Sequence, residues 1–444
     1  MNTQLEAGIG RRDITPVTGG RLMGYRPDLF SESVHDKLSV TAAAFCHGDT
    51  KVLIVSATLC LFQTELAGEI RALIAAETGF NTVILSATHT HSGPNTCGMV
   101  GWGGVDREYC DSVFIPHVKE AAKEAASSLK PVLMGIGTAR SRAGVNRRQH
   151  NEDGSISLGQ NPWGVFDPVM TVLSFTEALS AASGAASGRP VLSIVHYGAH
   201  CTAAGANTEI SRDWAGVMLD RLETETGAPA MFINGAEGDV GPRLSNGKTT
   251  GDISHARELG GIAAYDALLA LRNAKNGAPA DLSVISGELV LPLKPRMPYE
   301  TAQRLLAETP RDEVNIAGRT RQYYRNVIDA YHNNLPQKTA LVLPQTLVAM
   351  GGAVLVPFPF EVFSEITLRL RAYSPFAHTL CMGITNGSYG YLPSQDQLCR
   401  GGYEVEVFRT WGTEPFADNT DDNIIRENLK LIAQFPVFAG GLVH

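Results

Sequence analysis

Two histidines stand one residue apart in the stretch SATHTHSGPNT, residues 86 to 96. The preceding run NTVILSAT predicts a strand, and SGPNTCG cannot continue it as a central strand. If the strand extends through His91, then His89 and His91 project from the same face as Val83 and Leu85. Burying an imidazole without a partner costs roughly 1–3 kcal/mol. The pair therefore indicates metal ligation at a strand end, with hydrogen bonds to backbone carbonyls as the alternative.

A second histidine pair occurs in SIVHYGAHCTAAGANTEISRDWAG, which contains His196, His200 and Asp213. The four-residue spacing suits a zinc pair on a helix, but the glutamate of HExxH is missing and Gly198 lies between the histidines. We therefore expect a strand that runs into a loop. At least one of the two histidines is a candidate ligand, and the other is expected in the core or behind a ligand.

Two later segments contain isolated acidic or phenolic groups. In MFINGAEGDVGPR, three glycines surround Asp239, which permits a tight loop near a site, although a plain Gly-Asp turn is the alternative. Glu361 follows the apolar run VPFPF, and tyrosines 389, 391 and 403 occur in ITNGSYGYLPSQDQLCRGGYEVE. The segment with Glu361 and the segment with the three tyrosines each have a purely structural role as the alternative.

Strand patterns and helix patterns alternate along the chain. Short β-branched or apolar runs bounded by turn residues predict strands, among them KVLIVSAT, KPVLMGIG, PVMTVLSF, RPVLSIVHYG, APAMFIN, TLVAM, AVLVPF and TLCMGIT. Helical patterns cover roughly 64–78, 115–129, 214–226, 256–273, 299–307, 312–333, 362–371 and 422–434. The mixture predicts an α/β fold. We expect one domain over residues 1–444, with a helical embellishment around 299–334 packed on the sheet core and a surface connection at 177–190.

Composition and charge narrow the classes of partner. The 444 residues are 44% hydrophobic and 18% charged, which is typical of a folded globular protein. The formal charge of −8 is spread without a basic stripe, which argues against nucleic acid and anionic lipid and favours a small-molecule substrate. The first residues lack a signal-peptide pattern and no apolar stretch approaches membrane-spanning length, so we expect a cytoplasmic location and no integral membrane segment.

The seven cysteines form neither a disulfide framework nor a thiolate zinc site, because their number is odd and they lack CxxC spacing. Most are expected to be small core residues. Cys97 and Cys201 lie close in sequence to the histidines and are candidates for a place near a site, although core positions are favoured.

Taken together and in this order, these segments resemble the neutral/alkaline non-lysosomal ceramidase family. Members carry a THTHSGP motif, a later HxT histidine, a GDxSP loop, a PGE glutamate and an N-x4-Y tyrosine. The match runs from GIGRRDITP to GGYEVE, nearly the whole chain, and ATHTHSGP is close to letter-for-letter. The resemblance implies a mixed β-sheet core flanked by helices, as in the family's catalytic domain, without the C-terminal immunoglobulin-like domain.

The resemblance also implies one zinc ion per chain. Its ligands would be His89, His200, Glu361 and Tyr391, the last of which lies five residues after Asn386. Two imidazoles, a carboxylate and a phenolic oxygen suit zinc. The substrate-contacting and catalytic positions implied by the family are His91, Arg147, Asp239 and Tyr403, and Asp213 is implied to support the site from behind.

Three features depart from the family pattern. Gly241 stands where ceramidases place a serine two residues after the aspartate, so a serine nucleophile is not expected at that position. Phe360 replaces the glycine of PGE and is expected to narrow the space around Glu361. We expect neither the signal peptide nor the added C-terminal domain of the secreted ceramidases, which favours a soluble substrate over ceramide in a bilayer.

Without the serine, the expected chemistry is attack of a zinc-activated water on an amide, ester or lactone carbonyl. In this hypothesis Asp239 accepts the proton or orients the water. His91 and Tyr403 polarise the carbonyl or protonate the leaving group, and Arg147 holds an anionic or hydroxylated part of the substrate.

Three alternatives stay open. In the first alternative, the substrate is ceramide itself. The second is an amidohydrolase-type (β/α)8 barrel, which also uses an HxH pair but after its first strand and with eight regular units. The third is a zinc-containing small-molecule binding protein that has lost catalysis. Substrate identity and oligomeric state are not predicted.

Overall fold

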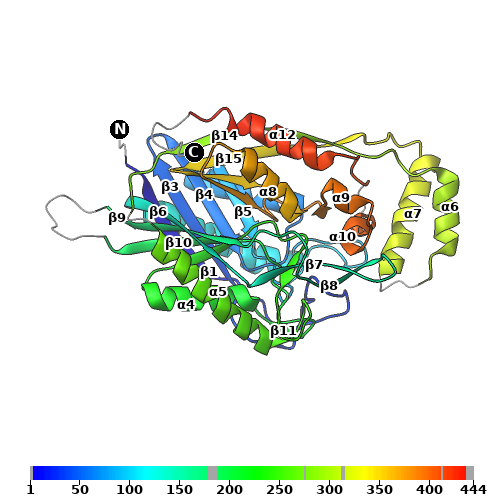
Figure 1. Cartoon of the computed structure of the whole chain (residues 1–444), viewed down its shortest axis with the longest axis horizontal. Coiled ribbons are helices and arrows are strands. Elements are labelled where there is room, and N and C mark those ends of the chain that lie inside the picture. Colours follow the sequence, from blue (N-terminus) through cyan, green and yellow to red (C-terminus); the bar gives the residue numbers. More distant parts are fainter. Residues whose placement is uncertain (1–3, 179–187, 275–276, 312–315, 412–413, 437–444) are drawn as a thin grey trace.

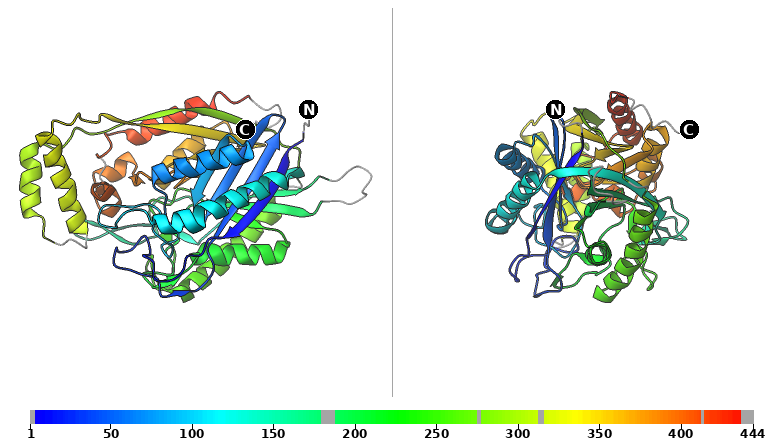
Figure 2. Two further views of the ribbon diagram at one scale, coloured as in Figure 1. Left: turned by 180° about the vertical axis from the view of Figure 1, so that it is seen from behind. Right: turned by 90° about the vertical axis from the view of Figure 1, so that its left-hand side faces the viewer.

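The computed structural model describes residues 4–178, 188–274, 277–311, 316–411 and 414–436. Within them, an eight-stranded sheet packs face to face on a four-stranded sheet, and helices cover both outer faces (Figures 1 and 2). The predicted α/β fold with a mixed sheet core flanked by helices is confirmed. Most of the predicted surface connection, residues 179–187, lies outside the described residues.

The larger sheet is mostly antiparallel and has parallel pairs at its two edges. Its strand order is β12-β10-β9-β6-β1-β3-β4-β5, with β4–β5 and β10–β12 parallel. This pattern excludes the (β/α)8 barrel, in which all eight strands run parallel. The strands are β1 (Glu6–Asp13), β3 (Ser39–His47), β4 (Thr50–Ala57), β5 (Thr82–Ala87), β6 (Lys130–Arg140), β9 (Val169–Glu177), β10 (Pro190–Tyr197) and β12 (Ala230–Asn234).

Both faces of this sheet are buried, which explains the uninterrupted apolar runs in its strands. In β4, Leu53 and Val55 contact the helix layer, while Val52 and Ile54 contact the second sheet. The helix layer consists of α1 (Thr64–Thr78) and α3 (Ile115–Ser127) over one half of the sheet, and α4 (Asp213–Thr226) and α5 (Ile253–Asn273) over the other. Short helical turns, α2 (Arg107–Tyr109) and a π-turn (Cys110–Phe114), precede α3.

The second sheet has the order β14-β15-β16-β18, and α8 and α12 cover its outer face. Smaller pairs and turns complete the part that surrounds the site. The bounds are β14 (Leu282–Pro292), β15 (Ala340–Met350), β16 (Ala353–Pro357), β18 (His378–Met382), α8 (Ser364–Tyr373), α12 (Thr420–Ile432), β13 (Val240–Pro242), β7 (Gly144–His150), β8 (Ile156–Asn161), β2 (Ser33–Val34), β11 (Glu209–Ile210), β17 (Glu361–Val362), β19 (Tyr391–Leu392), α9 (Gln395–Leu398), α10 (Tyr403–Glu406) and α11 (Phe408–Trp411).

The helical embellishment does not pack on the sheet core as expected. Helices α6 (Tyr299–Glu308) and α7 (Ile316–His332) lie between the two strands of the long β14–β15 hairpin in the sequence, and they stand at one end of the molecule (Figure 1). They form their own small core around Tyr323 and Tyr324, which includes Phe408 of α11. The expectation was wrong because the hairpin carries the pair beyond the sheet. Residues 312–315 of the predicted second helix lie outside the described residues.

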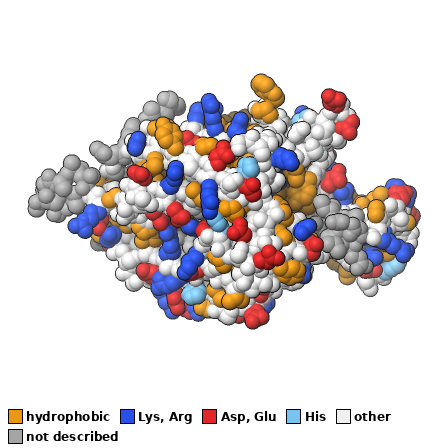
Figure 3. All heavy atoms as spheres, turned by 90° about the horizontal axis from the view of Figure 1, so that it is seen from below, with side chains coloured by type: hydrophobic (Ala, Val, Ile, Leu, Met, Phe, Trp, Pro, Cys, Tyr) orange, Lys and Arg blue, Asp and Glu red, His pale blue; other side chains and the backbone are white. Residues whose placement is uncertain are grey.

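Surface features agree with the expected absence of a basic stripe on the face shown. Basic and acidic side chains intermingle on the face seen from below (Figure 3). Among the residues that the structure describes, no helix is both long and apolar enough to cross a membrane.

The two edges of the larger sheet approach each other, and the seam between them is held by hydrogen bonds. The Ser56 hydroxyl donates to the Phe232 carbonyl at 2.6 Å, and Asn234 Nδ2 donates to the Thr88 carbonyl at 3.1 Å. Residues 383–386 lie along the seam, where Ala87 N donates to the Ile384 carbonyl. The loops that follow β5, β10 and β12 therefore converge.

We expect Asn234→Ala to weaken this seam. The buried side chain bonds the Thr88 carbonyl and both backbone groups of Ala199, so its removal leaves three buried polar groups without a partner. The expected loss in unfolding free energy is about 2–3 kcal/mol by urea denaturation. Asn333→Ala, at an exposed position, is the control and should change it by less than about 0.5 kcal/mol. Equal stability of the two variants would contradict the role of the seam.

Candidate metal centre

His89 and His91 lie in a loop and not on a continuing strand. Strand β5 ends at Ala87, and His89 has a left-handed backbone with φ 70°. The expectation of one shared strand face was therefore wrong, because a left-handed residue breaks the alternation of a strand. The loop instead runs beside the one after β10: Thr90 and Cys201 form a bridge, and His91 N donates to the Cys201 carbonyl. This contact brings His200 next to the pair.

Glu361 and Tyr391 come from the two-stranded parallel pair β17–β19. They are direct partners in its register, so both side chains leave the pair at the same level. Gly238 lies against the backbone of Glu361, where a Cβ would meet the Glu361 carbonyl at 2.4 Å. The glycine-rich loop after β12 therefore packs against the strand that carries Glu361, and its glycine is needed for close approach.

The structure brings the four implied ligands together, and His91 joins them. Glu361 Oε2 lies 3.0 Å from His200 Nε2 and 3.4 Å from His89 Nε2. His200 Nε2 lies 3.3 Å from the Tyr391 hydroxyl, and His91 Nε2 lies 3.2 Å from His89 Nε2. Zinc–ligand bonds of about 2.0–2.1 Å in a tetrahedron separate neighbouring ligand atoms by about 3.3 Å. The spacing of these atoms therefore fits one small divalent ion.

The hydrogens on the imidazoles support the same conclusion. His89 Nδ1 donates to the Cys60 carbonyl at 2.9 Å, and His200 Nδ1 donates to the Glu237 carbonyl at 2.8 Å. A ring that carries its one hydrogen on Nδ1 presents the lone pair of Nε2 toward the Glu361 carboxylate. Burial, and then the charge of Arg147, lowers the pKa of His200 to about 3, so a second proton is not held at neutral pH. Buried lone pairs that face one another repel, and a bound cation satisfies them.

Glu237 adds no second negative charge at this place. Its side chain is fully buried, and neither carboxyl oxygen has a hydrogen-bond partner among the described residues. Burial, together with the charge of Glu361, raises the pKa of Glu237 well above its usual range. Burial therefore favours the uncharged form of the Glu237 carboxyl group.

Arg147 contacts a ligand residue instead of facing the cavity. Its Nη2 donates to the Tyr391 hydroxyl at 2.8 Å, and its Nε donates to Glu404 Oε1 at 2.8 Å. Glu404 Oε2 accepts from Arg148 Nη1 at 2.7 Å, so one buried carboxylate joins two buried guanidinium groups. Glu404 was not predicted as a site residue; its position next to Tyr403 in GGYEVE was the available signal. This network fixes the phenol of Tyr391.

A cavity of about 200 Å³ opens beside the cluster. His91 and Tyr403 both line it. The ring of His91 packs against Gly24, which has φ 126° and where a Cβ would lie 2.3 Å from the ring. The remaining lining residues come from several loops: Met23, Gly24, Tyr25, Arg26, Pro27, Cys60, Leu61, His89, Met99, Trp102, Glu361, Tyr391 and Trp411.

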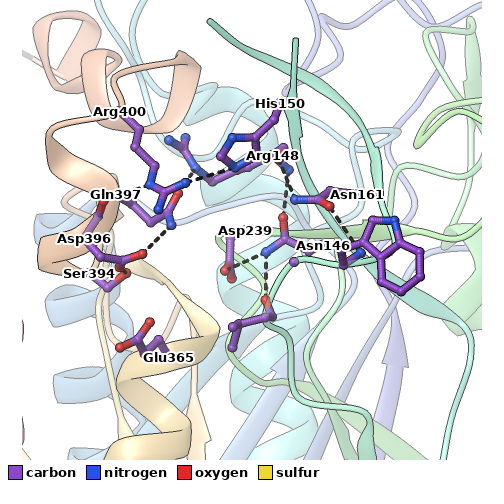
Figure 4. Close-up of a pocket in the computed structure, with 13 residues that line it drawn as sticks. Asn146, Arg148, His150, Asn161, Asp239, Glu365, Ser394, Asp396, Gln397 and Arg400 are labelled. Carbon is purple, nitrogen blue, oxygen red and sulfur yellow. Dashed lines mark hydrogen bonds between the residues drawn. The ribbon is translucent and has the colours of Figure 1, made fainter. Parts of the chain in front are cut away.

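Asp239 lines a different hollow, of about 400 Å³ (Figure 4). Its Oδ1 accepts from the backbone N and the hydroxyl of Ser364, and its Oδ2 accepts from Asn146 Nδ2. Burial raises the pKa of Asp239 to about 6. Asn146 and Arg148 line this hollow with Asp239, whereas Arg147, between them on β7, contacts Tyr391. The structure therefore does not bring Asp239 into the cavity that His91 and Tyr403 line.

Asp213 and His196 lie behind the cluster. The Asp213 carboxylate accepts from the backbone N of Ala203, Ala204 and Trp214, which shapes the loop after His200. His196 Nε2 bonds the Cys381 carbonyl at 2.7 Å and serves the core.

Three cysteines occupy buried positions around the loops of the site. Cys97 and Cys201 are buried, as expected. Cys60, which was not predicted to lie near the site, lies with Sγ 3.8 Å from His89 Nδ1 and lines the cavity.

Two of the three departures from the family pattern, Gly241 and Phe360, can be located in the structure. A Cβ on Gly241 would lie 2.8 Å from Cβ and Cγ2 of the buried Thr249, so Thr249 fills the room that a serine side chain needs. Phe360 was expected to narrow the space around Glu361, which is wrong. Its ring is buried in the core beneath the second sheet, against Tyr389 and Phe416, and is not part of the cavity lining.

Solved structures of ceramidases are similar to this chain, among them the following two. Neutral ceramidase from Pseudomonas aeruginosa superposes with a TM-score of 0.73 at 18% identity, over 98% of this chain and 76% of that chain. A ceramidase complexed with C2 gives a TM-score of 0.71 at 18% identity, over 97% and 75% of the two chains. The predicted resemblance to ceramidases is confirmed at the level of the fold. No protein-family model matches the sequence, and no curated protein matches it.

We expect His89→Ala and His200→Ala to abolish metal binding, because each removes one of the converging nitrogens. After zinc loading and dialysis, plasma mass spectrometry should find about one zinc per chain in the unmodified protein and less than about 0.1 in each variant. His332→Ala, at an exposed position on α7, is the control and should retain the metal. Full zinc content in His89→Ala would refute the ligand assignment.

The metal-free protein should lose stability as the pH falls below the ordinary histidine pKa. The folded pKa of His200 is about 3 and its ordinary value is 6.5, so the unfolded chain binds an extra proton between these two values. This histidine should lower the unfolding free energy by up to about 1.4 kcal/mol per pH unit in that window, and not above it. Urea unfolding of chelator-treated protein from pH 8 to 4.5 measures this slope. His200→Asn should flatten it, and an unchanged slope would contradict the assignment.

Proposed function

We propose that this chain is a zinc-dependent hydrolase that cleaves an amide, ester or lactone bond of a soluble small molecule. The observation that carries the proposal is the convergence of two imidazole lone pairs on the Glu361 carboxylate, which needs a cation. The ligand set of His89, His200, Glu361 and Tyr391 suits zinc, and His91 lies within reach of the same position. Similarity to the fold of ceramidases supports an amide as the bond that is cleaved.

Bound zinc would polarise the substrate carbonyl and activate water as the nucleophile. His91 presents Nε2 to the cluster and lines the cavity, so we assign it the exchange of a proton with the reacting atoms. Tyr403 lines the same cavity 5.8 Å from the Tyr391 ring, and its hydroxyl is assigned to the carbonyl oxygen. A single such donor contributes a factor of about 10²–10³ in rate.

Arg147 and Asp239 are assigned positioning roles. Arg147 orients the Tyr391 phenol through a hydrogen bond and is itself held by Glu404. Asp239 accepts hydrogen bonds from Ser364, the first residue of α8, which lies three positions after Glu361. These bonds fix the end of the strand that carries Glu361. Both carboxylate oxygens of Asp239 are occupied, which argues against a direct proton transfer to the substrate.

Water is the proposed nucleophile because the chain has no serine at residue 241. The packing of Thr249 against Gly241 supports this proposal, since a serine would need space that Thr249 already fills. A protein that binds zinc and a small molecule without catalysis is the second candidate. The cavity favours an enzyme over that candidate because it places an imidazole and a phenol beside the ligands.

Turnover by the zinc-loaded protein tests the proposal. We expect hydrolysis within a panel of N-acyl amides, esters and lactones, and loss of activity when a chelator removes the metal. Tyr403→Phe should lower kcat by about 10²-fold with little change in zinc content, because it removes one donor and no ligand. Gly241→Ser should not increase the rate, since the new side chain meets Thr249. Stoichiometric zinc without hydrolysis of any panel member would favour the binding protein.

A further inference from the structure

We propose that the hollow of about 400 Å³ that holds Asp239 binds a zwitterion with an apolar group, a free amino acid or a short peptide. This inference goes beyond the proposed function, because the hollow and the cavity beside the metal position have no described lining residue in common. Pockets that bind small molecules have volumes of about 300–1,000 Å³, so the hollow is large enough for such a ligand.

The floor of the hollow consists of buried polar side chains that are already bonded within the chain. Both carboxylate oxygens of Asp239 accept hydrogen bonds, and all three nitrogens of the Arg148 guanidinium group donate to other residues. The charged groups that a ligand can use therefore lie around the edge of the hollow.

One side of the edge is acidic. Glu365 on α8 and Asp396 on α9 both line the hollow, and among the described residues neither forms an ion pair. Arg369, one helical turn after Glu365, pairs instead with Asp421 and Asp422. Burial, and then the charge of Asp396, raises the pKa of Glu365. An ammonium group bound here would compensate both carboxylates.

The opposite side carries a cation. Figure 4 shows Arg400 and His150 on one side of the hollow and Glu365 on the other. Arg400 Nε donates to the Asp396 carbonyl at 3.2 Å, and its Nη1 lies 3.3 Å from His150 Nε2. Within the described part of the chain, no carboxylate pairs with Arg400. The guanidinium group is thus held through two nitrogens and presents the third, Nη2, to a ligand carboxylate.

An indole completes the edge. Trp163 lines the hollow and is 94% exposed. Its backbone N donates to Asn161 Oδ1, and Asn161 Nδ2 donates to the Arg148 carbonyl, so the turn is fastened to the floor. At Gly164 a Cβ would lie 2.4 Å from the Asn146 side chain, which requires the turn to lie close to the floor. The turn therefore holds a large apolar surface that an apolar ligand group can cover.

These three features together select the class of ligand. A simple amine would leave Arg400 without a partner, and a simple carboxylic acid would leave Glu365 without one. A sugar could cover the indole but has no charge for either group. A zwitterion with an apolar group contacts all three.

Calorimetry on the full-length, zinc-loaded protein tests this inference with ligands that each lack one feature. Phenylalanine represents the free amino acid and glycylphenylalanine the short peptide. At least one of the two should bind about five- to tenfold more tightly than phenethylamine, which lacks the carboxylate, and 3-phenylpropionate, which lacks the ammonium group. Alanine, which lacks the ring, should bind about tenfold more weakly than phenylalanine if the amino acid is the ligand, and glycylalanine more weakly than glycylphenylalanine if the peptide is.

Substitutions at the edge should act on one feature each. Glu365→Gln should weaken binding of the zwitterion and of phenethylamine about fivefold and leave 3-phenylpropionate unchanged. Arg400→Gln should weaken binding of the zwitterion and of 3-phenylpropionate and leave phenethylamine unchanged. Trp163→Ala should weaken binding of all three ligands about tenfold.

The matched controls are Glu300→Gln, Arg325→Gln and Tyr373→Ala, at exposed positions outside the hollow, and they should leave every affinity unchanged. Absence of saturable binding of both zwitterions would overturn the inference. So would equal affinity for a zwitterion and its two singly charged analogues, or binding that survives all three substitutions at the edge.

Discussion

The site depends on one carboxylate oxygen, Glu361 Oε2, which two imidazole nitrogens approach at 3.0 and 3.4 Å with lone pairs forward. Backbone carbonyls hold the hydrogens on the opposite nitrogens, so the rings cannot turn without losing these bonds. The imidazole lone pairs and the carboxylate oxygen repel one another, and this repulsion is strong because the dielectric constant of a buried environment is low. A divalent ion converts it into attraction. A bound metal ion should therefore contribute to the order of the surrounding loops.

The fold supplies this geometry through the curling of the larger sheet. Its edge pairs β4–β5 and β10–β12 are parallel, so the loops that follow β5, β10 and β12 all leave at the seam. Asn234 and Ser56 fasten the seam, and residues 383–386 fill it. The β17–β19 pair then adds a carboxylate and a phenol in register. The two histidines of the cluster meet because two sheet edges meet, and the β17–β19 pair brings Glu361 and Tyr391 to them.

Much of the fold was predictable, and the failures have local causes. Helix α1 was predicted with its observed bounds, because its pattern has period 3.6 and Gly79 ends it with a left-handed residue. Strand β3 was missed because SVTAAAFCH contains three alanines, which have low strand propensity; its buried neighbours on both faces determine its state. Strand β14 was also missed, although its pairing with β15 extends over eleven residues. Its stability comes from long-range pairing that a single segment does not reveal.

In the site, too, features set by local sequence were predictable and features set by long-range contacts were not. Residue types at the ends of apolar runs identified the histidines, because buried imidazoles demand a partner. The face that each one occupies was predicted wrongly, since the left-handed conformation of His89 is imposed by contacts with the loop after β4. Phe360 was expected to narrow the space around Glu361, but its ring packs in the core against Tyr389 and Phe416, contacts that come from distant segments. Glu404 gave no signal beyond its neighbour Tyr403, because its role arises from two arginines more than 250 residues away.

Glu404 also links the two hollows of the molecule. Arg147 and Arg148 are adjacent on β7 and point to opposite faces, one toward Tyr391 and the other toward the hollow that holds Asp239. One carboxylate compensates part of both buried charges, and removal of one partner from a buried pair costs about 3–5 kcal/mol. Arg148 is further held by Gln397 and the Gly401 carbonyl, which precede Tyr403 by a few residues. The orientation of the ligand Tyr391 and the placement of Tyr403 over the cavity therefore depend on the same three charges.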